Sequence, residues 1–194
     1  MPERRPQPAK ALPVLPSSQI SPGRLTIVGI GASAGGLEAA TRLMEALLPG
    51  SGMAFILVQH LDPSHKSMMV ELLARHTAMT VRQATEGMPI EPEHLYVIPP
   101  GTYLAVGEGV LHLSPPPVRQ RTRMPFDFLL NSMAEFYGER AACVVLSGTG
   151  MDGSAGLLAI KAKGGVVVAQ DPAEAGFDGM PRSAIQTGGV SFVL

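Results

Sequence analysis

The sequence is short of cysteine, of net charge and of long apolar runs, and each shortage excludes a class of protein. One cysteine, Cys143, occurs in 194 residues, so no disulfide can form within the chain and a disulfide-stapled secreted domain is excluded. A formal net charge of -1 lacks the basic excess typical of nucleic-acid-binding proteins. No stretch of about 18 apolar residues is present, so direct insertion into a membrane is not expected. We therefore expect a cytoplasmic protein without a nucleic-acid partner.

The length of the chain fits one folded domain behind a polar lead. Residues 1–24 are rich in Pro, Ser and Arg, and they cannot bury enough apolar surface to offset the entropy of ordering. Pro13 and Pro16 interrupt the one candidate for the apolar core of a signal peptide. We expect residues 1–24 to be a flexible Pro-rich lead or linker and residues 25–194 to form the domain.

Short apolar runs alternate with helical patterns along this domain. Continuous apolar strands separated by helices predict a parallel sheet with helices on both faces. Gly107-Glu108-Gly109, between two short runs, predicts an antiparallel hairpin. The expected strands are 25–30, 53–58, 94–98, 103–106, 110–113, 141–146, 165–169 and 191–193, and the expected helices are 37–48, 67–75, 126–137, 154–162 and 181–187.

Three loops of unusual composition follow strands of the predicted sheet, namely residues 31–36, 59–66 and 147–153. Right-handed crossovers place all strand-to-helix loops at one edge of a parallel sheet. Open α/β sheets bind their ligands at this carboxyl edge. We therefore expect a functional site to be built from these three loops.

The first loop contains two overlapping motifs. Gly29, Gly31 and Ala34 match the G-x-G-x-x-G/A fingerprint of dinucleotide-binding proteins. Residues 31–35, Gly-Ala-Ser-Ala-Gly, match the G-x-S-x-G elbow that exposes a nucleophilic serine. The elbow makes Ser33 a nucleophile, and the alternative is that Ser33 caps the following helix.

His60 ends the second expected strand. A dinucleotide site expects an acid at this point to hold the ribose, whereas a histidine can act as the general base beside Ser33. The alternative is a strand-end histidine that bonds backbone alone. His65, in the same loop, competes for the role of base, and the remaining histidines are His76, His94 and His112. No pair of histidines has metal-like spacing, so we expect no metal site and no cofactor.

Asp152 lies in the third loop. It could accept the imidazole N–H and fix the tautomer of the base, or it could cap the helix that follows. The glycine-rich loop also offers backbone N–H groups for an oxyanion hole, which we assign to Ala34, Thr149 and Gly150. Three loops at one edge thus supply a serine, a histidine and an acid, and together they predict a Ser-His-Asp triad. Their order in the chain differs from that of α/β-hydrolases.

The chain resembles the catalytic domain of the CheB-type chemotaxis methylesterase over residues 25–194. The matching segments are residues 31–36, 58–60, 149–153 and 179–185. The resemblance implies that Ser33 is the nucleophile, His60 the base and Asp152 the orienting acid. It also implies a Rossmann-like, doubly wound, mostly parallel sheet with an antiparallel hairpin, in three α/β/α layers.

The resemblance implies a reaction and partners as well. The implied reaction is hydrolysis of glutamate methyl esters, with glutamine deamidation as a second activity, on helices of chemoreceptors or related sensory proteins. Ala34 stands where the family usually has threonine. The classical enzyme has a receiver domain before its catalytic domain, whereas residues 1–24 stand there here, so we expect activity without phosphorylation. Residues 59–63 and 147–150 look closest to fused proteins, in which a methylesterase module precedes methyltransferase and sensory modules.

Arginines alternate in the Pro-rich loop before the expected helix 126–137. Arg121 and Arg123 match basic positions of the similar loop and are expected to bind substrate carboxylates, or alternatively to keep the loop solvated. Two other functions remain open: a non-catalytic signalling module that binds a partner, and a dinucleotide-dependent oxidoreductase. The presence of serine, histidine and aspartate together favours the esterase.

Overall fold

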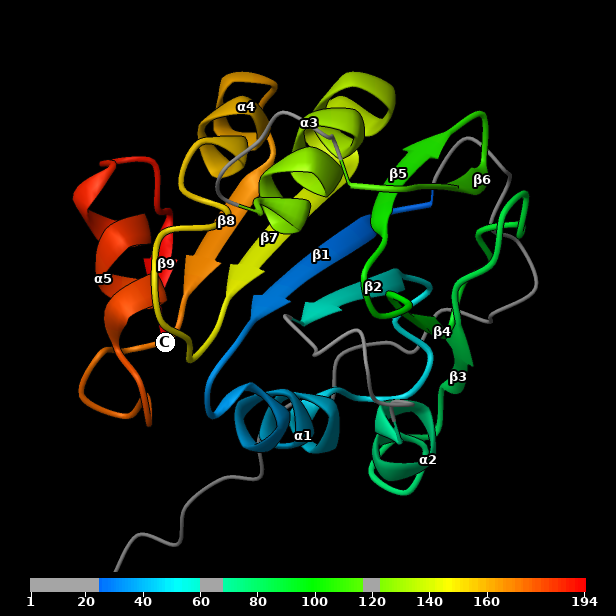
Figure 1. Cartoon of the computed structure of the whole chain (residues 1–194), viewed down its shortest axis with the longest axis horizontal. Coiled ribbons are helices and arrows are strands. Elements are labelled where there is room, and N and C mark those ends of the chain that lie inside the picture. Colours follow the sequence, from blue (N-terminus) through cyan, green and yellow to red (C-terminus); the bar gives the residue numbers. More distant parts are fainter. Residues whose placement is uncertain (1–24, 60–67, 117–122) are drawn as a thin grey trace, which may run out of the picture.

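The computed structural model describes residues 25–59, 68–116 and 123–194, and in these residues seven parallel strands form a central sheet (Figure 1). The strands run in the order β3-β4-β2-β1-β7-β8-β9, and every neighbouring pair is parallel. Their bounds are β1 Ile27–Ala32, β2 Ala54–Gln59, β3 Thr80–Gln83, β4 His94–Val97, β7 Ala141–Val145, β8 Val166–Ala169 and β9 Phe192–Val193.

Helices cover both faces of this sheet. They are α1 Gly36–Ala46, α2 Met69–Leu73, α3 Pro125–Tyr137, α4 Gly156–Ala162 and α5 Gly179–Gln186, with a short 3-10 helix at Gly138–Arg140. Figure 1 shows α1 and α2 on one face and α3 and α4 on the other. A separate antiparallel hairpin pairs β5 (Tyr103–Gly107) with β6 (Val110–Ser114). The Rossmann-like three-layer fold and its hairpin are thus confirmed.

Side chains of the central strands alternate between two hydrophobic cores. Ile27 joins the core formed with α3, α4 and α5, whereas its neighbours Val28 and Ile30 belong to the core formed with α1 and α2. Because successive side chains of a strand point to opposite faces, a strand covered on both sides must be apolar throughout. This explains why the central strands read as continuous apolar runs in the sequence.

The sequence did not predict β3, the edge strand. Its residues, Thr-Val-Arg-Gln, are mostly exposed, so they lack the apolar run that marked the other strands.

Cys143 is fully buried in β7, and burial raises the pKa of its thiol, as suits a core residue. Within the described ranges, no helix is long and apolar enough to span a bilayer.

The chain changes direction across the sheet at β1. From β1 the chain continues through α1 to β2 on one side, while β7 lies on the other side of β1. Such a topological switch point leaves a crevice at the carboxyl ends of the two strands that flank it. The loops after β1 and β7 therefore lie next to each other at the edge where a ligand is expected.

Phe126, in the first turn of α3, fits between two glycines of this region. A Cβ atom on Gly31 of β1 would overlap the Phe126 ring, and so would a Cβ atom on Gly153. The ring is fully buried. Glycine at both positions therefore lets α3 approach the ends of β1 and β7 closely, which brings three elements together at the carboxyl edge.

We expect Gly31→Ala to lower the free energy of unfolding by about 1–3 kcal/mol, because the added methyl group overpacks the Phe126 contact. Urea unfolding measures this change. Gly107→Ala is the matched control, since its nearest neighbours would lie 3.4–3.5 Å from the new atom, and it should cost less than about 0.5 kcal/mol. Equal losses in the two variants would contradict the close packing of Phe126.

Candidate active site

Ser33 follows β1 directly and lies against the loop that follows β7. Its backbone N–H donates to the Ser147 carbonyl at 3.0 Å, and its own carbonyl accepts the Gly36 N–H at 2.9 Å. The N-cap of α1 is Gly35, with φ of 70° and no side-chain cap. The alternative in which Ser33 caps this helix is therefore wrong, because glycine fills that position.

Ser147 ties the nucleophile loop to its neighbours. Its hydroxyl donates to the Ala34 carbonyl at 2.8 Å and accepts the Phe177 N–H at 3.0 Å. Its N–H donates to Oε1 of Gln170 at 2.8 Å. Ser147 is 1% exposed, so these bonds form in a dry environment. No sequence pattern indicates this role, because a serine at a strand end is common.

The glycines of the dinucleotide fingerprint do not form a phosphate-binding loop. Gly29 and Gly31 lie inside β1, under Met133 and Phe126 of α3. A dinucleotide site needs these glycines in the turn after the strand, where the backbone approaches the pyrophosphate. The packing thus assigns the glycines to the contact between the sheet and α3, and the oxidoreductase interpretation loses its motif.

Asp152 is 4% exposed and binds the start of α3. Its Oδ2 accepts the Phe126 N–H at 2.9 Å, and its Oδ1 accepts the Asp127 N–H at 3.0 Å. The sequence-based alternative made Asp152 a cap of α4, the helix that follows it. It caps α3 instead, so the carboxylate is held at both oxygens and faces the positive end of that helix dipole.

The proposed base and one arginine lie outside the described residues. His60 and its competitor His65 fall in residues 60–67, and Arg121 falls in residues 117–122, which the structure does not describe. The chain reaches this segment from Gln59, the last residue of β2, which pairs with Ala32, the residue before Ser33. The strand that leads into His60 and the strand that leads into Ser33 are therefore direct neighbours.

The histidines of the described chain interact away from the carboxyl edge. His76 Nδ1 lies 2.7 Å from Glu45 Oε1, and His112 Nδ1 lies 3.1 Å from Glu86 Oε1.

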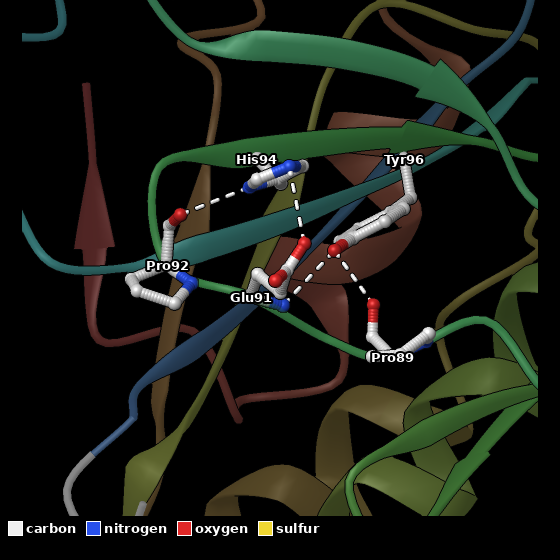
Figure 2. Close-up of polar contacts among 5 residues, drawn as sticks. All are labelled: Pro89, Glu91, Pro92, His94 and Tyr96. Atoms are coloured by element: carbon white, nitrogen blue, oxygen red, sulfur yellow. Dashed lines mark hydrogen bonds and ion pairs between the residues drawn. The ribbon is translucent and has the colours of Figure 1, made fainter. Parts of the chain in front are cut away.

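Figure 2 shows His94 at the start of β4, next to the fully buried Tyr96. Its Nδ1 lies 3.0 Å from the Pro92 carbonyl, and its Nε2 lies 3.5 Å from Glu91 Oε2. The Tyr96 hydroxyl donates to the Pro89 carbonyl and accepts the Glu91 N–H, each at 2.9 Å. This network organises the segment before β4, at the opposite edge of the sheet from Ser33.

Backbone N–H groups are available on both loops beside Ser33. Within residues 25–59, 68–116 and 123–194, those of Ala34, Thr149 and Gly150 donate to no backbone acceptor. A Cβ atom on Gly148 would lie 3.0 Å from Ser33 Cβ and would overlap Met180 of α5. Glycine at this position therefore lets the loop after β7 lie directly against Ser33.

A pocket of about 150 Å³ lies beside the ends of β2 and β4. Arg123 lines it, together with Gln59, Tyr103 and Pro125. The Gln59 Oε1 atom is buried and has no hydrogen-bond partner in the part of the chain that the structure describes. The pocket is thus lined by Arg123 and by Gln59, the residue that precedes His60 in the sequence. The sequence analysis considered Arg123 but not Gln59, and the substrate-binding role of Arg123 stays a prediction.

Comparisons with known proteins agree on one family. The family model of the CheB methylesterase matches residues 28–194. A protein-glutamate methylesterase/protein-glutamine glutaminase of Photorhabdus laumondii is 36% identical over 172 residues, which cover 87% of this chain and 49% of that protein. The protein of the same name from Salmonella typhimurium is 34% identical and covers 100% of this chain and 54% of its own length. The chain thus spans about half the length of these relatives.

Two further matches describe the same domain in other settings. An uncharacterized 104.1 kDa protein of Rhodobacter capsulatus is 46% identical over 126 residues, which are 65% of this chain and 13% of that protein. The crystal structure of the Thermotoga maritima CheB methylesterase catalytic domain superimposes with a TM-score of 0.78 at 30% identity. That match covers 87% of this chain and 92% of the solved domain. Sequence and fold together show that the chain belongs to the CheB methylesterase family.

Proposed function

We propose that this domain is a serine hydrolase that removes methyl esters from glutamate side chains of chemoreceptor-like proteins and deamidates glutamine at similar positions. One observation carries the proposal. Ser33 and Asp152 follow adjacent parallel strands on the two sides of the switch point, and Gly148 lies against the Ser33 side chain. The names of the family relatives, protein-glutamate methylesterase/protein-glutamine glutaminase, give the reaction class.

The chemistry proceeds through an acyl-enzyme. The Ser33 hydroxyl oxygen attacks the ester carbonyl while His60 takes the hydroxyl proton. His60 then gives that proton to the departing methoxide, which leaves as methanol. Water activated by His60 hydrolyses the glutamyl-serine ester, which frees a glutamate carboxylate and restores Ser33. For a glutamine substrate the same steps release ammonia.

Asp152 orients the base in this mechanism. A carboxylate offers about four lone-pair sites, and the backbone bonds to Phe126 and Asp127 use two of them. In the proposed triad Asp152 also accepts the N–H of His60, which fixes the tautomer whose other nitrogen faces Ser33. Ala34, Thr149 and Gly150 supply backbone N–H donors for the oxyanion that forms on the carbonyl.

The partners follow from the same proposal. Methylated helices of chemoreceptors or related sensory proteins present the ester, and Arg121 and Arg123 attract the unmodified glutamates beside it. Fusion to methyltransferase and sensory modules would deliver such a substrate within one polypeptide. The size of the Rhodobacter capsulatus relative, of which the matched region is 13%, supports the occurrence of this domain in long chains.

A non-catalytic signalling module that keeps the fold and binds a partner is the alternative function. The two candidates differ at Ser33. A fluorophosphonate probe reacts with an activated serine and should label this residue in the hydrolase. A module that only binds a partner has no activated serine, so the probe would leave it unlabelled.

Ser33→Ala should lower methanol release from a methylated receptor peptide by about 10⁴-fold or more, since triad removals elsewhere have this effect. The variant should unfold at nearly the wild-type urea concentration, because the Ser33 contacts to Ser147 and Gly36 use backbone atoms. Near wild-type turnover in the folded variant would overturn the triad.

Asp152→Asn should lower both turnover and stability. An asparagine replaces one carboxylate oxygen by an NH₂ group, which must face the N–H of Phe126 or Asp127. We expect a loss of about 1–3 kcal/mol in the free energy of unfolding and a fall in kcat on the order of 10³- to 10⁴-fold. The free energy of unfolding and kcat are measured on the same preparation, at a temperature at which the variant is fully folded. If the folded variant keeps its kcat, Asp152 serves α3 alone.

Arg121→Ala combined with Arg123→Ala should lower kcat/KM for a methylated peptide rich in glutamate and flatten its salt dependence. Rim charges speed the association of a charged partner and are screened by salt. Arg75→Ala is a control of the same chemistry, since Arg75 is exposed after α2. A small neutral ester should be hydrolysed equally by all variants, and equal losses on both substrates would show that the arginines act structurally.

A further inference from the structure

Asp127 sits in the first turn of α3 and holds the turn that contains Asp152. Its Oδ1 accepts the Ala155 N–H at 3.0 Å and the Gly156 N–H at 2.7 Å. These N–H groups belong to the start of α4, whose first turn has no acceptor within its own helix. The Asp127 carboxylate therefore joins α3 to the chain just after Asp152.

The two aspartates cap each other's helices. Asp152, before α4, accepts the first N–H groups of α3, and Asp127, on α3, accepts the first N–H groups of α4. The same residue takes part twice, since the Asp127 N–H donates to Asp152 Oδ1. A Cβ atom on Gly156 would lie 3.1 Å from the Asp127 backbone, so the helix starts are in close contact.

This arrangement fixes the turn at both ends. On its own, the cap from Asp152 would leave the following turn free to pull the carboxylate away from α3. The Asp127 bonds anchor that turn three to four residues further along the chain. A shift of about 1 Å in a catalytic group costs on the order of 10²-fold in rate, so this anchor matters for an acid that must orient a histidine.

We propose that Asp127 is a positioning residue of the triad, which holds the 152–156 turn on α3 and thereby sets the Asp152 carboxylate that orients His60. The inference rests on the proposed function. It assigns Asp127 no contact with substrate.

The charge of Asp127 is costly in this place. Burial raises the pKa of its carboxyl, and the neighbouring Asp152 charge raises it further, while the N–H donors of the turn lower it. The useful property of the side chain is thus its acceptor oxygen rather than its charge. Asparagine offers the same oxygen without the charge, so Asp127→Asn should recover about tenfold or more of the kcat that Asp127→Ala loses.

The kinetic test compares these two variants on a methylated receptor peptide and on a small activated ester. Asp127→Ala should lower kcat on the order of 10²-fold on both substrates, with KM changed less than about threefold. Asp127→Asn should recover at least about a tenth of the wild-type kcat, because its amide oxygen accepts the same N–H groups.

Glu93→Ala controls for lost stability. Glu93 also accepts two backbone N–H groups, from Gly50 at 3.0 Å and from Gly52 at 2.6 Å. It lies before β4, at the amino edge of the sheet. The control should lower the free energy of unfolding and leave kcat at the wild-type value. An Asp127→Ala variant that loses no more kcat than this control overturns the proposal.

A double-mutant cycle identifies the route of the effect. In an Asp152→Ala background, Asp127→Ala should lower kcat less than about twofold further, since residues that act as one unit are not additive. Independent, multiplied losses would mean that Asp127 does not act through Asp152.

Amide hydrogen exchange keeps the inference separate from the proposed function. The Phe126 N–H is bonded to Asp152, so its protection reports whether that carboxylate stays in place. Exchange at Phe126 should speed up about tenfold or more in Asp127→Ala, and not in Glu93→Ala. If the wild-type domain hydrolyses neither ester, the proposed function fails and this measurement still decides the positioning role. Unchanged protection in Asp127→Ala would refute it.

Discussion

The structure of the candidate site depends on a carboxylate at the start of a helix. Asp152 lies after β7, and both of its oxygens bind N–H groups of α3. A carboxylate that is 4% exposed would be costly to bury alone, and the two backbone bonds and the dipole of α3 offset that cost. The same two bonds fix the position of the carboxylate on α3, which is what the proposed role of Asp152 as the orienting acid of a triad requires.

The sheet and α3 bring the other parts of the site to this carboxylate. The switch point between β1 and β7 puts the Ser33 loop next to the Asp152 loop. Phe126 follows Pro125 at the start of α3 and packs on Gly31 and Gly153, which belong to these two segments. Ser147 then bonds the backbone N–H of Ser33 and the carbonyl of Ala34. Fold stability and site geometry are thus supplied by the same contacts, so substitutions here need a stability control.

Much of the fold could be predicted from the sequence, because the strands that support the site are buried on both faces. Such strands read as unbroken apolar runs, and the residues that follow them form the candidate site, which is why the sequence leads to Ser33 and Asp152 as candidates. The edge strand β3 was missed because its exposed side chains carry no such pattern. Given the strands, the parallel pairing and the helices on both faces follow from general rules of α/β proteins.

Long-range contacts set the limit of the sequence-based prediction. Asp152 was considered as a cap for the helix that follows it, but it caps a helix that begins 27 positions earlier at Pro125, a pairing that no local pattern encodes. Asp127 reads as an ordinary acid in a first helical turn, and its bonds to Ala155 and Gly156 arise from the packing of α3 on α4. Ser147 likewise bonds residues that are distant in the sequence, namely Ala34, Gln170 and Phe177.

The most direct test of the central claim is to trap the reaction halfway. Acid quenching of the domain with a methylated receptor peptide, followed by peptide mapping in a mass spectrometer, detects a covalent acyl-enzyme if one forms. We predict that Ser33 is esterified by the glutamyl group of the peptide. The mass added to the Ser33-containing fragment should equal the mass of the methylated peptide minus that of methanol. Methanol release with no adduct at any time point, or an adduct on a residue other than Ser33, would contradict the mechanism.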